Sequence, residues 1–215
     1  LYEGTTLYLS KGLLVAAGDL ARRYAQAQGN TPCAALFTVA ESYRKNGWLR
    51  ETIITLEEAT LLCDGSSDAA MRLAYAYAEN AQPLPAAHLF ERLSLKDATL
   101  LQAASEQYRL AGHFFEAQRL AMGMADDAQR RTQLAVIFLQ TDAFDTVVQV
   151  LEPVFNSGSL DEQGTFRLAY GALRSGRIDL AEKTLARLKD NHWKEPVAQM
   201  QQTLSRCITA PWDCW

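Results

Sequence analysis

The four cysteines are the residues of this sequence with the most distinctive chemistry. They are Cys33, Cys63, Cys207 and Cys214. No two of them form a CxxC pair, and no histidine lies close enough in sequence to complete a zinc-binding pattern. Their chemistry is therefore either that of reduced thiols in a cytosolic protein or that of disulfide bonds in an oxidising compartment. Spacing alone leaves both alternatives open.

Histidines and carboxylates could supply acid–base catalysis, but their arrangement does not favour it. The histidines are His88, His113 and His192, which are far apart in sequence. The acidic pairs Asp126–Asp127 and Asp161–Glu162 are typical of the first turn of a helix, where the helix dipole favours negative charge. The sequence contains no glycine-rich phosphate loop, nucleophile elbow or HExxH motif. We expect no enzymatic activity, no cofactor and no metal site.

A six-residue stretch recurs along the chain and indicates which elements position these residues. Its copies are Gly12–Ala17, Gly47–Thr52, Ala81–Ala86, Gly112–Ala117, Asp142–Val147 and Gly176–Ala181. Each copy opens with a turn-capable or small residue and places Ala, Val or Thr five positions later. The opening residues are 35, 34, 31, 30 and 34 positions apart. A period in this range is typical of stacked supersecondary units.

The sequence around the second copy predicts a helical hairpin. Leu36, Val39, Ala40 and Tyr43 follow an i, i+3, i+4, i+7 spacing, which places them on one face of a helix of about 13 residues. Gly47 ends this helix because glycine tolerates the left-handed conformation of a helix exit. A second helix is expected from about residue 48 to residue 62. Two helices joined by so short a turn pack antiparallel.

The later units repeat this pattern. Each first helix has a small residue, which is followed about one turn later by an aromatic residue or, in the last unit, by Ala172. Examples are Leu73-Ala74 before Tyr77, Ala103-Ala104 before Tyr108, Leu134-Ala135 before Phe138 and Leu168-Ala169 before Ala172. Together with the glycine turn, this pattern resembles the tetratricopeptide repeat (TPR), a helix–turn–helix family of 34 residues. The resemblance covers about residues 1–190. It implies an all-α fold, a right-handed superhelix of about six TPR-like helix–turn–helix repeats plus a C-terminal capping helix.

The expected domain organisation follows from these repeats. We expect a single solenoid over residues 1–206, with repeats near 1–30, 31–64, 65–97, 98–126, 127–159 and 160–192. A polar cap over 196–206 covers the last exposed face, and a tail with Cys and Trp spans 207–215. The short steps of 31 and 30 residues predict clipped helices or tighter turns between residues 111 and 142. In the tail, Trp212 and Trp215 either pack on the cap or form a contact patch.

The four cysteines can form two local pairs, one across a predicted hairpin and one within the tail. Cys33 begins the first helix of its unit and Cys63 ends the second, so antiparallel packing brings these two ends together. Cys207 and Cys214 bracket a short segment of the tail. We therefore favour two disulfides, subject to the Cα separation that such a bond requires, and an oxidising compartment. Free thiols in a cytosolic protein are the alternative.

The resemblance also implies a partner-binding groove, because the first helices of TPR proteins commonly contact an extended peptide or a helix. The residues beside the core stripe are Phe37, Glu41, Arg44, Met71, Tyr75, Gln102, Glu106, Arg109, Thr132, Val136, Phe166 and Tyr170. The mixture is mainly aromatic and aliphatic with few charges, which favours an apolar or amphipathic segment. The alternative is that residues such as Phe37 and Phe166 only pack on adjacent repeats.

Composition excludes several classes of partner. The net charge is −4 and the basic residues are scattered, whereas nucleic-acid binding needs a concentrated basic footprint. No apolar run approaches the roughly 20 residues needed to cross a bilayer. We expect neither nucleic-acid binding nor direct membrane insertion. Leu1 is either a mature terminus or the boundary of an excised fragment.

The function expected from the sequence is that of a non-enzymatic scaffold for protein–protein interaction. We place it in the periplasm or another exported location, within a bacterial envelope assembly such as pilus biogenesis, secretion or polysaccharide export. A cytoplasmic chaperone or adaptor for an apolar client segment is one alternative. The regulatory repeat region of a larger enzyme is another, and self-association stays open.

Overall fold

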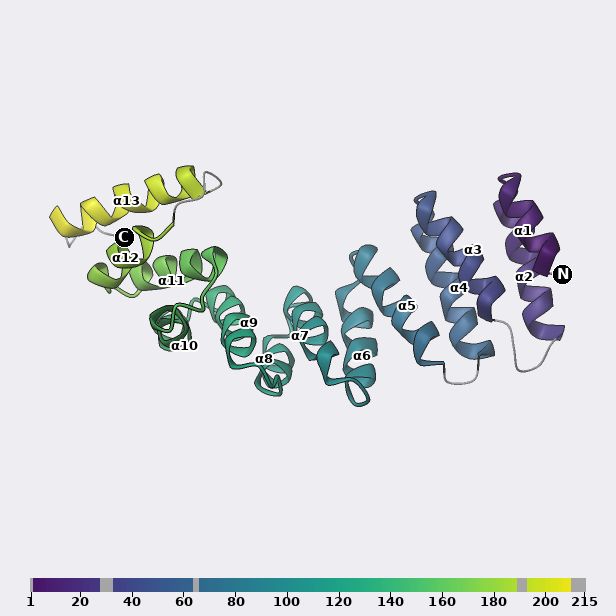
Figure 1. The fold of residues 1–215 in the computed structure, drawn as a ribbon, viewed down its shortest axis with the longest axis horizontal. Coiled ribbons are helices and arrows are strands. Elements are labelled where there is room, and N and C mark those ends of the chain that lie inside the picture. Colours follow the sequence, from purple (N-terminus) through teal and green to yellow (C-terminus); the bar gives the residue numbers. More distant parts are fainter. Residues whose placement is uncertain (1, 28–32, 64–65, 189–192, 210–215) are drawn as a thin grey trace. The chain divides into compact units, whose positions relative to one another are not determined.

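The computed structural model describes residues 2–27, 33–63, 66–188 and 193–209, and all regular structure in these ranges is helical (Figure 1). The chain groups into two compact units, Leu1–Ala117 and Gln118–Trp215, which we describe separately. The division falls within α8 (Phe114–Met122). The single solenoid over residues 1–206 and the repeat limits stay predictions.

The first unit consists of helices in which each packs on its neighbours along the chain. They are α1 (Tyr2–Ser10), α2 (Leu14–Ala27), α3 (Cys33–Lys45), α4 (Leu49–Leu62), α5 (Ser67–Glu79), α6 (Pro83–Ser94), the 3₁₀ turn η1 (Ala98–Leu100) and α7 (Leu101–Leu110). The helices α7 and α8 have 10 and 9 residues, whereas α3, α4 and α5 have 13 or 14. The clipping predicted from the short sequence steps is confirmed for α7 and α8 but not for Asp127–Gln140, a helix of 14 residues in the same stretch.

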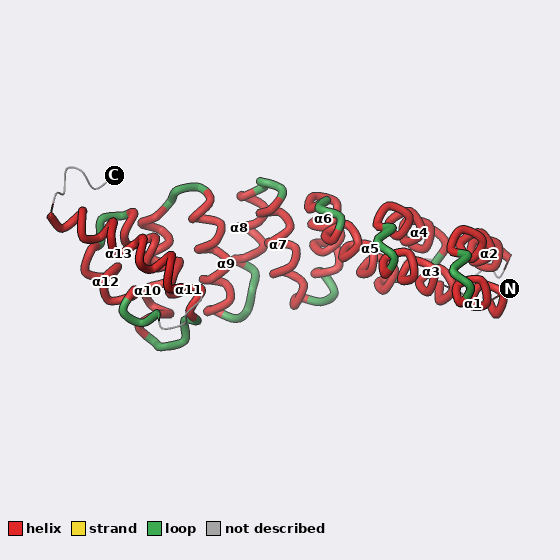
Figure 2. Tube along the Cα trace, turned by 90° about the horizontal axis from the view of Figure 1, so that it is seen from above, coloured by secondary structure: helices red, strands yellow, loops and turns green. Residues whose placement is uncertain are grey.

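Three-residue turns join the two helices of each hairpin, and Figure 2 shows them as short loop segments between helices. The middle residue has a positive φ in every one of them: Gly12, Gly47, Ala81, Gly112, Asp142 and Gly176. These are the six residues that open the recurring stretch of the sequence. Four of them are glycines, for which this conformation carries no steric cost. Ala81 (φ 52°) and Asp142 (φ 55°) adopt it despite their side chains.

The core of the first unit is built from small side chains interleaved with larger ones. The predicted stripe of Leu36, Val39, Ala40 and Tyr43 is buried throughout. The Tyr43 hydroxyl donates a hydrogen bond to the Leu14 carbonyl oxygen at 3.0 Å, which ties α3 to the start of α2.

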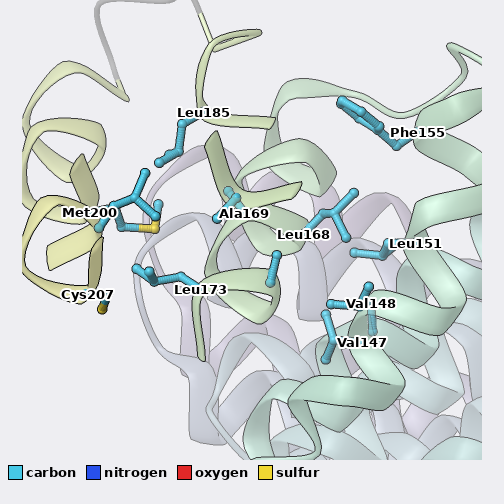
Figure 3. Packing of buried hydrophobic residues seen from close by; sticks show 14 residues of the cluster. Val147, Val148, Leu151, Phe155, Leu168, Ala169, Leu173, Leu185, Met200 and Cys207 are labelled. Atoms are coloured by element: carbon cyan, nitrogen blue, oxygen red, sulfur yellow. The ribbon is translucent and has the colours of Figure 1, made fainter. Parts of the chain in front are cut away.

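The second unit has its own hydrophobic core, drawn in Figure 3. Its complete helices are α9 (Asp127–Gln140), α10 (Phe144–Asn156), α11 (Glu162–Arg174), α12 (Ile178–Leu185) and α13 (Lys194–Thr209). Figure 3 shows Met200 and Cys207 of α13 facing Leu173 of α11 and Leu185 of α12. Burying an apolar side chain of this size contributes about 1.5–3 kcal/mol, so α13 covers the end of this core.

The capping helix is longer than the sequence predicts. We expected it over residues 196–206, but α13 runs from Lys194 to Thr209. Cys207 therefore belongs to the helix and not to the tail, and its side chain is buried. Nothing in the sequence pattern ends the helix at residue 206, because its apolar face continues through Leu204 to Cys207. Cys214, Trp212 and Trp215, for which the sequence predicted a disulfide and a packed or contact tail, lie outside the described residues.

Candidate partner-binding pocket

Helices α3, α4 and α5 of the first unit enclose a cavity of about 340 Å³. Its lining residues are Phe37, Ala40, Glu41, Arg44, Thr52, Leu56, Arg72, Tyr75, Ala76 and Glu79. Four of them (Phe37, Glu41, Arg44 and Tyr75) belong to the groove predicted from the sequence. We call this cavity the α3–α5 pocket.

The floor of the α3–α5 pocket is apolar. Phe37 is half-buried and packs against two core clusters of the first unit, so it contributes to the fold as well as to the pocket. The Arg72 guanidinium lies 4.7 Å from the centroid of the Phe37 ring, within the range of a cation–π contact. Tyr75 is 53% exposed, and its ring meets that of Phe90 edge to face at 5.1 Å. Tyr75 is thus a fixed aromatic surface that no described residue covers fully.

The rim of the pocket carries charges that are paired with one another. Arg44 bonds Glu41 at 2.9 Å and Glu79 at 3.2 Å. Arg72 pairs with Asp68 at 3.1 Å. The hydrogen bond from Arg44 is the main cause that lowers the pKa of the Glu41 carboxyl below its usual value. The expectation of few charges is wrong for this pocket, but each lining cation has its own carboxylate and none is left for a ligand.

Two of the rim residues, Arg72 and Glu79, were not predicted from the sequence. Neither lies on the stripe chosen beside the core. The pair Arg44–Glu79 joins α3 to α5 across 35 positions, close to one repeat length. Opposite charges one repeat apart on successive first helices are the signal that could have found this pair.

The other predicted groove residues of the first unit lie outside the α3–α5 pocket. Met71 is half-buried and Gln102 is exposed. On α7, Arg109 and Glu106 form an ion pair at 2.5 Å. This pair is internal to one helix, so the structure does not bring these residues into the pocket.

In the second unit, two of the predicted groove residues, Phe166 and Tyr170, pack against the core of that unit. Thr132 and Val136 on α9 are half-buried. Phe166 stacks on Trp193 with the ring centroids 4.5 Å apart. The Tyr170 ring lies edge to face against Phe144 at 5.8 Å. Phe166 and Tyr170 both pack against the second core, which supports the alternative that such residues hold repeats together.

Two of the three histidines meet at a buried tyrosine, although they are far apart in sequence. The Tyr108 hydroxyl lies 2.9 Å from Nδ1 of His88 and donates to Oε2 of Glu91 at 2.5 Å. The His113 ring lies 6.1 Å from the Tyr108 ring, centroid to centroid. These contacts tie α6 to α7 and to the turn that follows. His192 lies outside the described residues.

The first predicted cysteine pair has the Cα separation that a disulfide requires. The sulfur atoms of Cys33 and Cys63 lie within bonding distance, and the Cα atoms are 6.0 Å apart across a sequence separation of 30. The pair closes the end of the α3–α4 hairpin that is opposite to the turn at Gly47. The second predicted pair cannot be described in the same way, since Cys214 lies outside the described residues.

The described residues also bear on metal and membrane binding. Within the described ranges, no three His, Cys, Asp or Glu side chains gather in a way that could hold a metal ion. None of the helices described is long and apolar enough to cross a membrane.

Comparisons with known proteins identify the fold but no family. No family model matches the sequence, and no curated protein matches it either. Solved structures do resemble this chain. A tetratricopeptide repeat protein from Parabacteroides merdae is 15% identical, with a TM-score of 0.59 over 86% of this chain and 76% of the other. The C-terminal part of a TPR repeat-containing protein from Cytophaga hutchinsonii is 11% identical, with a TM-score of 0.67 over 99% and 90%.

A third similar structure is PilF of Pseudomonas aeruginosa, which is 13% identical with a TM-score of 0.54 over 91% of this chain and 95% of that one. The chain therefore has an all-α, TPR-like fold, as the repeated turn and the small–aromatic pattern predicted. At such low identity the likeness shows the fold alone.

Proposed function

We propose that this protein is a non-enzymatic scaffold that binds a segment of another protein in the α3–α5 pocket. The observation that carries the proposal is the combination of an apolar floor, a half-exposed Tyr75 and a rim whose charges neutralise one another. Arg44 and Arg72 balance Glu41 and Glu79 among the lining residues. A rim without a free charge favours an apolar or amphipathic segment over an acidic one.

The size of the pocket limits what it holds. A cavity of about 340 Å³ is at the small end of the range for ligand sites. It accommodates an anchor of one or two side chains, while the remainder of the segment lies along the surface. Aromatic anchors such as Tyr75 often supply much of the binding energy at protein interfaces.

A site-specific crosslinking experiment tests the pocket directly. We would replace Tyr75 with the photoreactive residue p-benzoylphenylalanine in the source cells, irradiate them and identify adducts by mass spectrometry. The matched control places the same residue at Leu110, which is also 53% exposed but lies outside the pocket. We expect a polypeptide adduct at Tyr75 and none at Leu110. The same adducts at both positions, or none at Tyr75, would refute the proposed site.

We further propose that the protein acts in an exported compartment, within a bacterial envelope assembly such as pilus biogenesis, secretion or polysaccharide export. Two findings support this placement. The Cys33–Cys63 pair fits a disulfide, and disulfides persist in oxidising compartments. The fold resembles that of PilF. Four reduced thiols in the purified protein would instead favour the cytoplasmic adaptor.

A further inference from the structure

A second cavity in the first unit lies at a different set of helix ends. The last turn of α4, the start of α5 and the end of α6 enclose about 480 Å³. Its lining residues are Thr60, Leu61, Ser66, Ser67, Ala70, Arg92, Leu93, Leu95 and Lys96. We call this cavity the α4–α6 groove. It shares no residue with the α3–α5 pocket, and Figure 1 shows the three helices following one another.

Two leucines on the wall of the α4–α6 groove are almost fully exposed. Leu61 is 82% exposed and Leu95 is 85% exposed. The buried face of α4 is formed by Thr52, Thr55 and other residues up to Ala59, so Leu61 contributes nothing to the core. Single exposed leucines are common on protein surfaces, but two that wall one cavity form an apolar surface available to a partner.

The groove also carries two cations that have no carboxylate partner among the described residues. Within the described ranges, neither Arg92 nor Lys96 forms an ion pair, whereas the cations of the α3–α5 pocket all do. The Ser66 hydroxyl is already used, because it accepts a hydrogen bond from the Ala69 amide at 3.3 Å. The groove thus offers two cations and two leucines in a chain whose net charge is −4.

We propose that the α4–α6 groove binds an acidic polypeptide segment that carries leucine-like side chains beside its carboxylates. Carboxylates complement Arg92 and Lys96, and apolar side chains cover Leu61 and Leu95. A lipid surface fits less well, since attachment to anionic membranes typically uses a cluster of about 4–8 basic residues. A recessed cavity also suits side chains better than a flat array of head groups.

Fluorescence anisotropy tests the proposal with a defined probe. The probe is a fluorescein-labelled peptide of about 12 residues made of Glu, Leu and Ala, and its charge-reversed counterpart carries Lys for Glu. We expect R92E/K96E to weaken binding of the acidic peptide by about tenfold at low salt, since attraction becomes repulsion at two sites. L61S/L95S should weaken it by a similar factor. Binding to the unmodified protein should fall as salt is raised.

The matched control is K11E/R23E, which makes the same change in net charge on α1–α2, away from the groove. It should bind the acidic peptide as the unmodified protein does, and a Tyr75→Ala variant of the other pocket should as well. Three outcomes would overturn the proposal: no binding of the acidic peptide, equal loss in K11E/R23E, or equal binding of the Lys peptide. A lipid surface is the other possible partner. If the protein sediments with phosphatidylglycerol vesicles, R92E/K96E abolishes this sedimentation and the acidic peptide does not bind, the groove binds lipid and the proposal is overturned.

Discussion

Breaking the link between Cys33 and Cys63 is the sharpest test of how the first unit is held together. The two residues are 30 positions apart, and both are half-buried, so replacing their side chains with serine removes little packing. On the chain-entropy model, a loop of this length contributes about 3.5 kcal/mol by restricting the unfolded state. With a urea slope of about 2 kcal/mol/M, C33S/C63S should lower the unfolding midpoint by about 1.8 M.

Hydrogen exchange followed by mass spectrometry is the assay, because it reports each unit by its own peptides. The whole loop lies within Leu1–Ala117, so protection should fall in that unit. A reductant should destabilise the first unit of the unmodified protein by the same amount, and it should have no further effect there on C33S/C63S. The reasoning is refuted if the denatured, untreated protein yields four titratable thiols, or if the reductant leaves the first unit unchanged. The same thiol titration decides between the exported and the cytoplasmic placement.

Three further predictions concern the turns, the helix contacts and the pocket rim. Replacing Ala81 by Gly should raise the unfolding free energy by about 0.5–1 kcal/mol, because relief of left-handed strain exceeds the entropy that Gly adds to the unfolded state; a lower urea midpoint would contradict this. A Cβ at Gly171 would lie 2.8 Å from Cγ1 of the fully buried Val147. Gly171→Ala should therefore lower the free energy of unfolding by about 1 kcal/mol or more in the same urea assay. An increase in this free energy would show that α10 and α11 move apart easily at this contact. The pKa of Glu41 is lowered in the folded state, so its ionised carboxylate adds to the free energy of unfolding. This contribution is present above the unfolded pKa of about 4.3 and is lost as pH falls through the lower folded pKa. Urea midpoints of Glu41→Gln and the unmodified protein should therefore differ at neutral pH and converge in acid. If the difference between the two midpoints does not change with pH, the ion pair with Arg44 is not the cause of that difference.

The helical hairpins could be predicted from the sequence because their signals are local. A glycine that must leave a helix with positive φ is visible at Gly47 and Gly112 without any knowledge of the fold. Ala81 and Asp142 carry no such signal by themselves. They were identified only by their register with the other turns, and the structure places both in the left-handed region.

The pocket was harder to predict because its chemistry depends on how successive repeats are offset. Glu41 and Arg44 belong to the predicted stripe, but the partner that completes the rim, Glu79, comes from the next first helix. Phe166 illustrates the opposite error. Its position on α11 matches a groove residue, yet Trp193, directly before the last helix, stacks on it. Contacts between elements that are separated in sequence decide both cases. The repeat spacing could have indicated Arg44–Glu79, but the spacing of residues within one helix indicates neither contact.

The α3–α5 pocket and the α4–α6 groove show which positions of the first unit can vary with the partner. Helix α4 lines both of them, with Leu56 in the α3–α5 pocket and Leu61 in the α4–α6 groove. Leu56 lies on the buried stripe that every repeat must keep, so it cannot vary freely with the partner. Leu61 and Arg92 are free of that constraint, since neither contributes to the core. The charges are paired in the α3–α5 pocket and unpaired among the described residues in the α4–α6 groove. The helix α4 therefore borders a neutral anchor site and, within a few turns, a basic groove. We expect the two sites to bind different segments.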